Sequence, residues 1–185
     1  MFQEALATIL SRLESARAHG LLRAYALIGG FAVSAWGMPR ATQDIDFAVA
    51  MGSSDPEALA TFLGGRYEAG GPDDPLRGVV HASIEVESEA IALQLIFLSS
   101  PLTEVTFRHI HILAVMDRAV PVVSWQVLVL LKLYAGGPQD LLDAQQILKV
   151  RHPQPDDLRQ IAETAESMGI LEEWTALLSR HPQED

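Results

Sequence analysis

Apolar residues follow a helical period at the start of the chain and then switch to shorter runs that are typical of strands. The spacing over residues 2–13 predicts an amphipathic helix that ends near Gly20. Residues 24–28 (AYALI) form an apolar run that predicts a buried strand leading into two glycines. Helical spacing resumes over residues 31–37. The opening of the chain therefore predicts a helix, a strand and a second helix.

The clearest strand signal lies in the middle of the chain. Residues 80–86 alternate apolar and polar, and after a tight turn at residues 88–89 comes a second apolar strand over 90–98. With that turn, apolar residues face each other in four pairs: Val86 with Ile91, Ile84 with Leu93, Ala82 with Leu95, and Val80 with Phe97. This register predicts that Glu85 and Gln94 lie diagonally across from each other on the opposite face of the sheet.

Shorter signals surround this hairpin. We expect a strand around Ile45 and a helix that begins after the cap residue Asp55. The Gly, Pro and Asp content of residues 68–78 predicts a loop, which we expect to be the most mobile part of the core. Residues 110–115 and 119–123 are further short strands.

From residue 124 onward the pattern is helical throughout. The expected helices cover residues 125–137, 138–150, 155–170 and 171–180. This order predicts an α/β (α+β) fold, a mixed sheet with flanking helices followed by a C-terminal helical segment. Residues 1–123 would form the core and residues 124–185 a helical region packed on it, as one compact unit.

Composition and charge narrow the classes of function. The 185 residues carry 13 Lys and Arg against 24 Asp and Glu, a net charge of -11, which gives no general attraction to nucleic-acid phosphates or anionic membranes. A polyanion would have to be held by a metal or by a few placed cations. The chain has no cysteine, its start does not resemble a signal peptide, and its longest apolar run is too short for a membrane span. We therefore expect a cytoplasmic protein.

Candidate chemistry begins with two aspartates, Asp44 and Asp46, inside an expected strand. Side chains alternate along a strand, so both carboxylates project from one face, about 7 Å apart, and repel each other unless a cation lies between them. Oxygen ligands of this kind suit Mg²⁺ or Mn²⁺ together with substrate phosphates. Upstream, Gly29 and Gly30 between a strand and a helix let backbone N–H groups approach an anion. A triphosphate would bridge the two features, although an ordinary turn and a solvated strand end also explain them.

Taken together, these residues resemble a known family. The stretch GGFAVSAWGMPRATQDIDFAV (residues 29–49) is similar to the signature of the nucleotidyltransferase superfamily related to DNA polymerase beta. It resembles in particular the branch that contains the AbiEii abortive-infection toxins and other small bacterial nucleotidyltransferase-like proteins. The later stretch LKLYAGGPQDLLDAQQIL resembles further motifs of that branch, a helical Lys followed by Asp-x-x-Asp on the next helix. The resemblance implies a nucleotidyltransferase-type fold.

The resemblance also implies roles for single residues. Gly29 and Gly30 would cradle nucleotide phosphates, Asp44 and Asp46 would hold Mg²⁺ or Mn²⁺, and Lys132 would touch phosphate. The other matching motif residues are Arg40, Thr42, Asp140 and Asp143, of which the first three complete the expected nucleotide site. The implied reaction is attack of an acceptor hydroxyl on the α-phosphate of a nucleoside triphosphate, with pyrophosphate leaving.

The sequence departs from the family pattern at the third carboxylate, which members bring from a later strand. The matching stretch ALQLIFL offers Gln94, whose neutral amide can lend an oxygen to a metal but cannot act as a base. Because the expected hairpin register places Glu85 diagonally across from Gln94, we consider Glu85 as a replacement carboxylate, or as a solvated strand residue. The basic residue often found just before Asp140 is also missing.

These residues support three hypotheses about function. The first is a metal-dependent nucleotidyltransferase of toxin-antitoxin or defence type that acts on an RNA end, a protein or a small molecule. The second is a catalytically degenerate member that binds nucleotide or a partner protein such as an antitoxin. The third is an antibiotic nucleotidyltransferase, since such enzymes share the early motif and a small acceptor suits the acidic surface.

Overall fold

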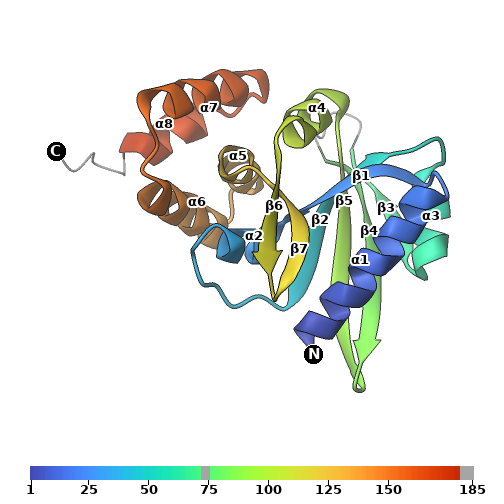
Figure 1. Cartoon of the computed structure of the whole chain (residues 1–185). Helices are drawn as coiled ribbons and strands as arrows, with labels where there is room; N and C mark the ends of the chain where they lie inside the picture. The colour runs from blue at the N-terminus through green and yellow to red at the C-terminus, as the bar shows by residue number, and fades with distance from the viewer. Residues whose placement is uncertain (72–75, 180–185) are drawn as a thin grey trace.

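One mixed sheet forms the centre of the computed structural model, which describes residues 1–71 and 76–179 (Figure 1). The strands run in the order β3-β4-β5-β2-β1-β7-β6. Their bounds are β1 Leu22–Ile28, β2 Asp44–Met51, β3 Arg66–Ala69, β4 Leu76–Val86, β5 Glu89–Leu98, β6 Ile110–Val115 and β7 Arg118–Val123. Strand β2 is parallel to β5 and β1 is parallel to β7, whereas the other neighbouring pairs are antiparallel.

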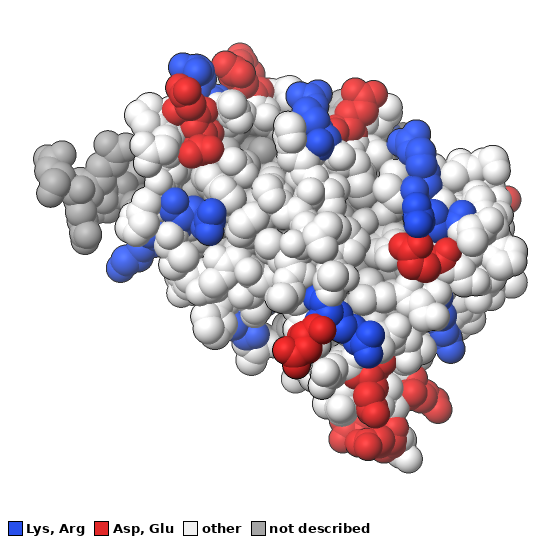
Figure 2. Space-filling model, viewed as in Figure 1, with Lys and Arg blue, Asp and Glu red and all other residues white. Residues whose placement is uncertain are grey.

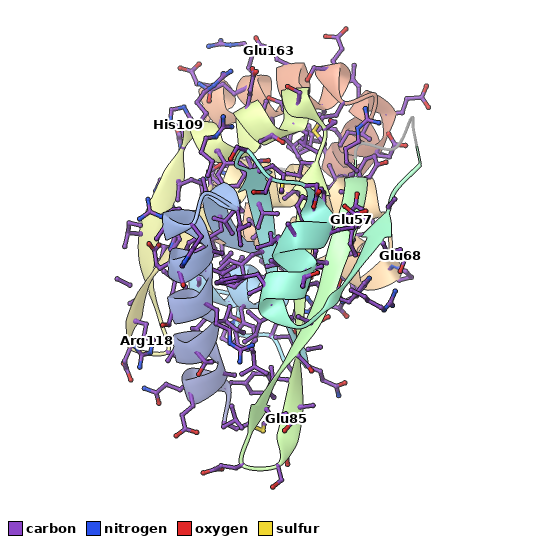
Figure 3. All side chains as sticks on the ribbon, turned by 90° about the vertical axis from the view of Figure 1, so that its right-hand side faces the viewer. Glu57, Glu68, Glu85, His109, Arg118 and Glu163 are labelled. Atoms are coloured by element: carbon purple, nitrogen blue, oxygen red, sulfur yellow. The ribbon has the colours of Figure 1, made fainter. Side chains whose placement is uncertain are left out.

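Helices lie on both sides of this sheet. They are α1 Phe2–Ala18, α2 Gly29–Ala35, α3 Pro56–Leu63, α4 Ser100–Arg108, α5 Trp125–Ala135, α6 Pro138–Arg151, α7 Pro155–Ser167 and α8 Leu171–Ser179. Helices α1 and α3 lie side by side on one face (Figure 3), and α5 to α8 gather beyond α2 (Figure 1). In the described part of the chain, no helix has both the length and the apolar character to cross a bilayer.

The alternation of side chains along β2 decides which residues reach each face. The Tyr25 hydroxyl donates a hydrogen bond of 2.6 Å to Glu14 of α1, and the Tyr25 ring packs edge-on against Phe47. Phe47, which is fully buried, therefore faces α1. Asp44 and Asp46 have the opposite parity, so they project from the other face of the sheet.

Local capping explains where several helices begin and end. The Asp55 side chain accepts a hydrogen bond of 2.7 Å from the backbone N–H of Ala58, and Gly64 closes α3 with a φ of 71°. The Ser124 hydroxyl accepts from the N–H of Val127 in the same way, and Gly136 closes α5 with a φ of 67°. These are the caps that a sequence pattern can predict, and the cap at Asp55 is confirmed.

Two elements differ from the sequence-based expectation. Strand β3 and helix α4 were not predicted, and the expected loop over 68–78 is shorter, because β3 continues to Ala69 and β4 begins at Leu76. Residues 72–75, which belong to the segment predicted to be mobile, lie outside the described residues.

The predicted register of the β4–β5 hairpin is wrong. The two turn residues are Glu87 and Ser88, both with positive φ, so that Val86 pairs with Glu89. The partner of each β4 residue therefore shifts by two positions, and Glu85 faces Ala90. Three of the four β4 residues, Val80, Ala82 and Ile84, still face apolar partners, because a shift of two preserves the alternation of faces.

Candidate functional site

The site is built on the face of the sheet that is turned away from α1. Asp46 of β2 lies beside Gln94 of β5 on one side and beside Ile28 of β1 on the other. Neighbouring strands are about 4.8 Å apart, so the side chains of Asp46 and Gln94 share one row across this face. Because Gly29 directly follows Ile28, the glycine pair lies at the same end of the sheet.

Both glycines are needed for close packing around the aspartates. Gly29 has a φ of 65°, and a Cβ atom at this position would overlap the Asp46 carboxylate. A Cβ atom at Gly30 would lie 2.7 Å from Cβ of Thr42 and 3.0 Å from Nη1 of Arg40. The backbone at the start of α2 can therefore come this close to the carboxylate and the adjoining loop only with glycine.

The two aspartates have different surroundings. Thr42 donates a hydrogen bond of 2.7 Å from Oγ1 to Oδ1 of Asp44. Burial and, to a smaller extent, the charge of Asp44 together raise the pKa of Asp46 to about 7, although Lys132 and Arg40 act in the opposite direction. Without a cation, the carboxyl of Asp46 is thus partly protonated at neutral pH.

Lys132 is buried rather than extended into solvent. Its Nζ atom lies 2.7 Å from Oδ1 of Asp140 and 3.0 Å from Oδ2 of Asp143. Nη1 of Arg40 lies 3.1 Å from the same Oδ2 atom, so that Asp143 bridges two cations. Gln139 donates a hydrogen bond of 3.0 Å to the other oxygen of Asp143. This network connects α5 and α6 to the loop that precedes the aspartate strand.

Asp143 was quoted in the second motif but not predicted as a site residue. Its side chain is only 1% exposed and lies beyond the first turn of α6, so a favourable interaction with the helix dipole does not account for it. The signal that could have identified it is the Asp-x-x-Asp spacing from Asp140, since both aspartates contact Lys132.

Glu85 is not part of the site. It faces Ala90 near the tip of the β4–β5 hairpin (Figure 3), whereas Gln94 pairs with His81. The step of four residues from His81 to Glu85 corresponds to about 13 Å along a strand. The expected diagonal contact between Glu85 and Gln94 is therefore wrong, because the hairpin turn lies one residue earlier than predicted.

The donors fit a divalent cation that brings further ligands with it. In the described residues, no cluster of three or more His, Asp or Glu side chains could hold a metal alone. Asp44 and Asp46 with the Gln94 amide oxygen offer a partial set of oxygen ligands, which a substrate phosphate would complete. The site has four acidic side chains and two basic ones, Arg40 and Lys132. The acidic ones are Asp44, Asp46, Asp140 and Asp143, so the site favours a cation over a free anion.

Comparisons with known proteins agree with this geometry at the level of the fold. No family model matches the sequence, and a comparison with curated proteins gives no match. A "putative nucleotidyltransferase" from Thermotoga maritima superposes with a TM-score of 0.50 at 11% identity, over 80% of this chain and 92% of that chain. The chain has the nucleotidyltransferase fold. An antigenic nucleotidyltransferase-like protein from Paracoccidioides brasiliensis has the same TM-score at 16% identity, over 92% of each chain.

The nucleotidyltransferase fold confirms the predicted fold class. At 11% and 16% identity these structures show the fold alone, so membership of the superfamily stays a prediction. The narrower likeness to the AbiEii branch rests on the motifs alone and stays a prediction. ANT(2″)-Ia, solved with adenylyl-2″-tobramycin, superposes with a TM-score of only 0.44 at 16% identity, over 94% of this chain and 97% of that chain. That degree of likeness does not bear on the acceptor of this chain.

The raised pKa of Asp46 predicts a pH-dependent stability. A carboxyl whose pKa rises from 3.8 in the unfolded chain to about 7 in the fold stabilises the fold below pH 3.8, and this contribution is lost as the pH rises through 7. We therefore compare the free energy of unfolding of Asp46→Asn with that of wild type by urea unfolding in EDTA. The difference, variant minus wild type, should rise by about 1–3 kcal/mol from pH 4 to pH 8. The exposed substitution Asp117→Asn should show no such gain, and an equal gain in both variants would contradict the assignment.

The Asp143 network predicts a large loss of stability when its centre is removed. Asp143→Ala leaves two cations without their shared partner, so urea unfolding should show a loss of about 3–5 kcal/mol. The exposed pair Asp156–Arg159, 3.0 Å apart, is the matched control, and Asp156→Ala should cost less than about 1 kcal/mol. Similar losses for the two variants would show that the buried network does not hold the helices to the core.

Proposed function

We propose that the protein is a metal-dependent nucleotidyltransferase, which transfers a nucleoside monophosphate from a nucleoside triphosphate to a hydroxyl acceptor. The observation that carries the proposal is the Asp44–Asp46 pair in a nucleotidyltransferase fold, with the Asp46 carboxylate packed directly against Gly29. The raised pKa of Asp46 supports it, because a carboxyl that is largely removed from water and lies beside a second carboxylate resists ionisation when no cation is present.

Each residue then has a task in substrate binding. Asp44, Asp46 and the Gln94 amide oxygen would hold Mg²⁺ or Mn²⁺, which would neutralise phosphate charge when bound. The hydrogen bond from Thr42 fixes the orientation of the Asp44 carboxylate. Backbone N–H groups at Gly29 and Gly30 can approach a phosphate, because no side chain stands in the way.

Lys132 and Arg40 are held near the aspartates by acidic partners. Both cations lower the pKa of Asp46, so their charges reach the site. Both also contact Asp143, which means that a phosphate must compete with that carboxylate for them. A triphosphate carries more negative charge than a single phosphate. It would therefore compete better with Asp143 for Lys132 and Arg40 when it binds with its cation.

Gln94 favours a second candidate function, nucleotide binding without transfer. An amide in the position of the third carboxylate supplies no charge to a metal and accepts no proton from an attacking hydroxyl. The AbiEii-like motifs support a narrower proposal for either case, a role in a toxin-antitoxin or defence module with a partner such as an antitoxin. The net charge of -11 favours a small-molecule acceptor over an RNA end.

Titration calorimetry with ATP, GTP, CTP and UTP tests the nucleotide site. We expect binding of at least one nucleotide in Mg²⁺ or Mn²⁺, and binding at least about tenfold weaker in EDTA. Asp44→Asn/Asp46→Asn should abolish the metal-dependent part, whereas the exposed pair Asp117→Asn/Asp156→Asn, with the same change in charge, should leave it intact. If no nucleotide binds with either metal, or if both double variants bind equally, the proposal fails.

Gln94→Asp separates the two candidate functions. Because the new carboxylate would lie beside Asp46, Mn²⁺ titration should give an affinity at least about fivefold tighter than wild type. Glu85→Gln, at the distant hairpin position, should leave the Mn²⁺ affinity unchanged. If only Gln94→Asp releases pyrophosphate from the bound nucleotide, the wild-type protein binds nucleotide without transferring it. If the wild-type protein also releases pyrophosphate, it is an enzyme. An unchanged Mn²⁺ affinity in Gln94→Asp would place the metal elsewhere.

A further inference from the structure

An open groove of about 730 Å³ separates α1 from the β6–β7 hairpin, on the side of the sheet opposite the aspartates. One wall is a single stripe of α1, whose members recur every three or four residues from Ala7 through Leu10 and Glu14 to Arg17. The floor includes Ala24 of β1. Asp44 and Asp46 do not line this groove, so it is separate from the proposed nucleotide site.

The second wall is apolar and exposed. Ile110 and Ile112 of β6 and Pro121 of β7 line it, and the Ile112 side chain is 66% exposed. His111, between the two isoleucines, points the other way, since its ring packs against Trp36. The hairpin therefore has one face covered by Trp36 and one apolar face turned toward the groove.

The layer of helices on this side of the sheet is incomplete. Helices α1 and α3 pack mainly on strands β1, β3 and β4, and α4 reaches the groove with Phe107, while Ile110, Ile112 and Pro121 of β6 and β7 stay open to it. Figure 2 shows the result, a broad area without charged side chains in the middle of this face, bordered by basic and acidic groups. Sheets in α/β folds normally bury such a face against a helix.

The charges that border the groove are mainly basic, in contrast to the rest of the protein. Arg17, Arg23 and Arg118 line it with a single acid, Glu14, whereas the whole chain carries a net charge of -11. Glu14 pairs with Arg17 at 2.7 Å. Arg23 and Arg118 form no ion pair with any residue described in the structure. The border is thus complementary to an acidic segment, while a second copy of this acidic chain would be repelled overall.

We propose that this groove binds an amphipathic helix from a partner protein, with apolar side chains on one face and carboxylates near its ends. The ten-residue step from Ala7 to Arg17 along α1 corresponds to about 15 Å, the length of about three helical turns. The apolar face of the partner helix would cover Ile112 and Leu10 and complete the helical layer. Its carboxylates would pair with Arg23 and Arg118.

Two synthetic peptides test the proposal directly. Both are helical 14-mers with leucines at positions i, i+3, i+4 and i+7, and they differ only in carrying glutamates or lysines at their ends. Fluorescence anisotropy with the full-length protein should give binding of the glutamate peptide that is at least about tenfold tighter than that of the lysine peptide. The difference should shrink with added salt.

Matched variants locate the binding surface. Ile112→Asp should weaken the glutamate peptide at least about fivefold, and Leu142→Asp, at a 50%-exposed position on α6, should not. Arg23→Ser/Arg118→Ser should abolish the preference for glutamate over lysine while leaving the apolar wall in place. Nucleotide binding should be unchanged in all these variants. The proposal for the groove and the proposal for the nucleotide site are therefore tested independently.

Three results would overturn the proposal. The first is equal binding of the two peptides, or no binding at millimolar concentration. The second is glutamate-peptide binding that both Ile112→Asp and the double arginine variant leave intact. The third is a wild-type dimer, detected by light scattering, that Ile112→Asp dissociates, because the occupant would then be a second copy of this chain.

Discussion

The repulsion between Asp44 and Asp46 is the constraint around which the candidate site is arranged. Both carboxylates project from one face of β2, and burial together with mutual repulsion raises the pKa of Asp46 to about 7. A fold that only needed stability would place apolar residues here, as it does at Phe47. Gly29 contributes to the same arrangement, since any side chain at that position would displace the Asp46 carboxylate.

The C-terminal helices are connected to this strand through charge as well as through apolar packing. Asp143 of α6 contacts Lys132 of α5 and Arg40 of the loop before β2. A bridge of this kind positions two cations near the aspartates without a bound ligand, at the desolvation cost that buried ion pairs carry. The helical region would thus contribute to the nucleotide site as well as covering the core.

The sequence predicted the elements that have a strong period and missed those that do not. Strand β3 has four mostly exposed residues next to Gly65 and Gly70, which is the composition of a loop. Helix α4 combines a proline in its first turn with several β-branched residues, so its propensity for a helix is weak. The hairpin register was wrong because a turn at Glu87–Ser88 and a turn one residue later both preserve the alternation, and neither contains the glycine or asparagine that would distinguish them.

The site shows the same division between local and long-range information. The shared face of Asp44 and Asp46 follows from strand parity, which is local. The meeting of Arg40 with Asp143 joins residues about a hundred positions apart, and no local pattern encodes it. Glu85 was proposed from a register and failed with that register, whereas Gln94 lies beside Asp46 in the parallel pairing of β2 and β5.

Anomalous diffraction from crystals grown with Mn²⁺ and a nonhydrolysable nucleoside triphosphate would test the central claim most directly. The account predicts a manganese peak within about 2.1–2.3 Å of oxygens from both Asp44 and Asp46, with a phosphate oxygen among its ligands. It also predicts that the peak disappears in Asp44→Asn/Asp46→Asn. A nucleotide bound without manganese at this pair, or manganese bound only elsewhere, would contradict it.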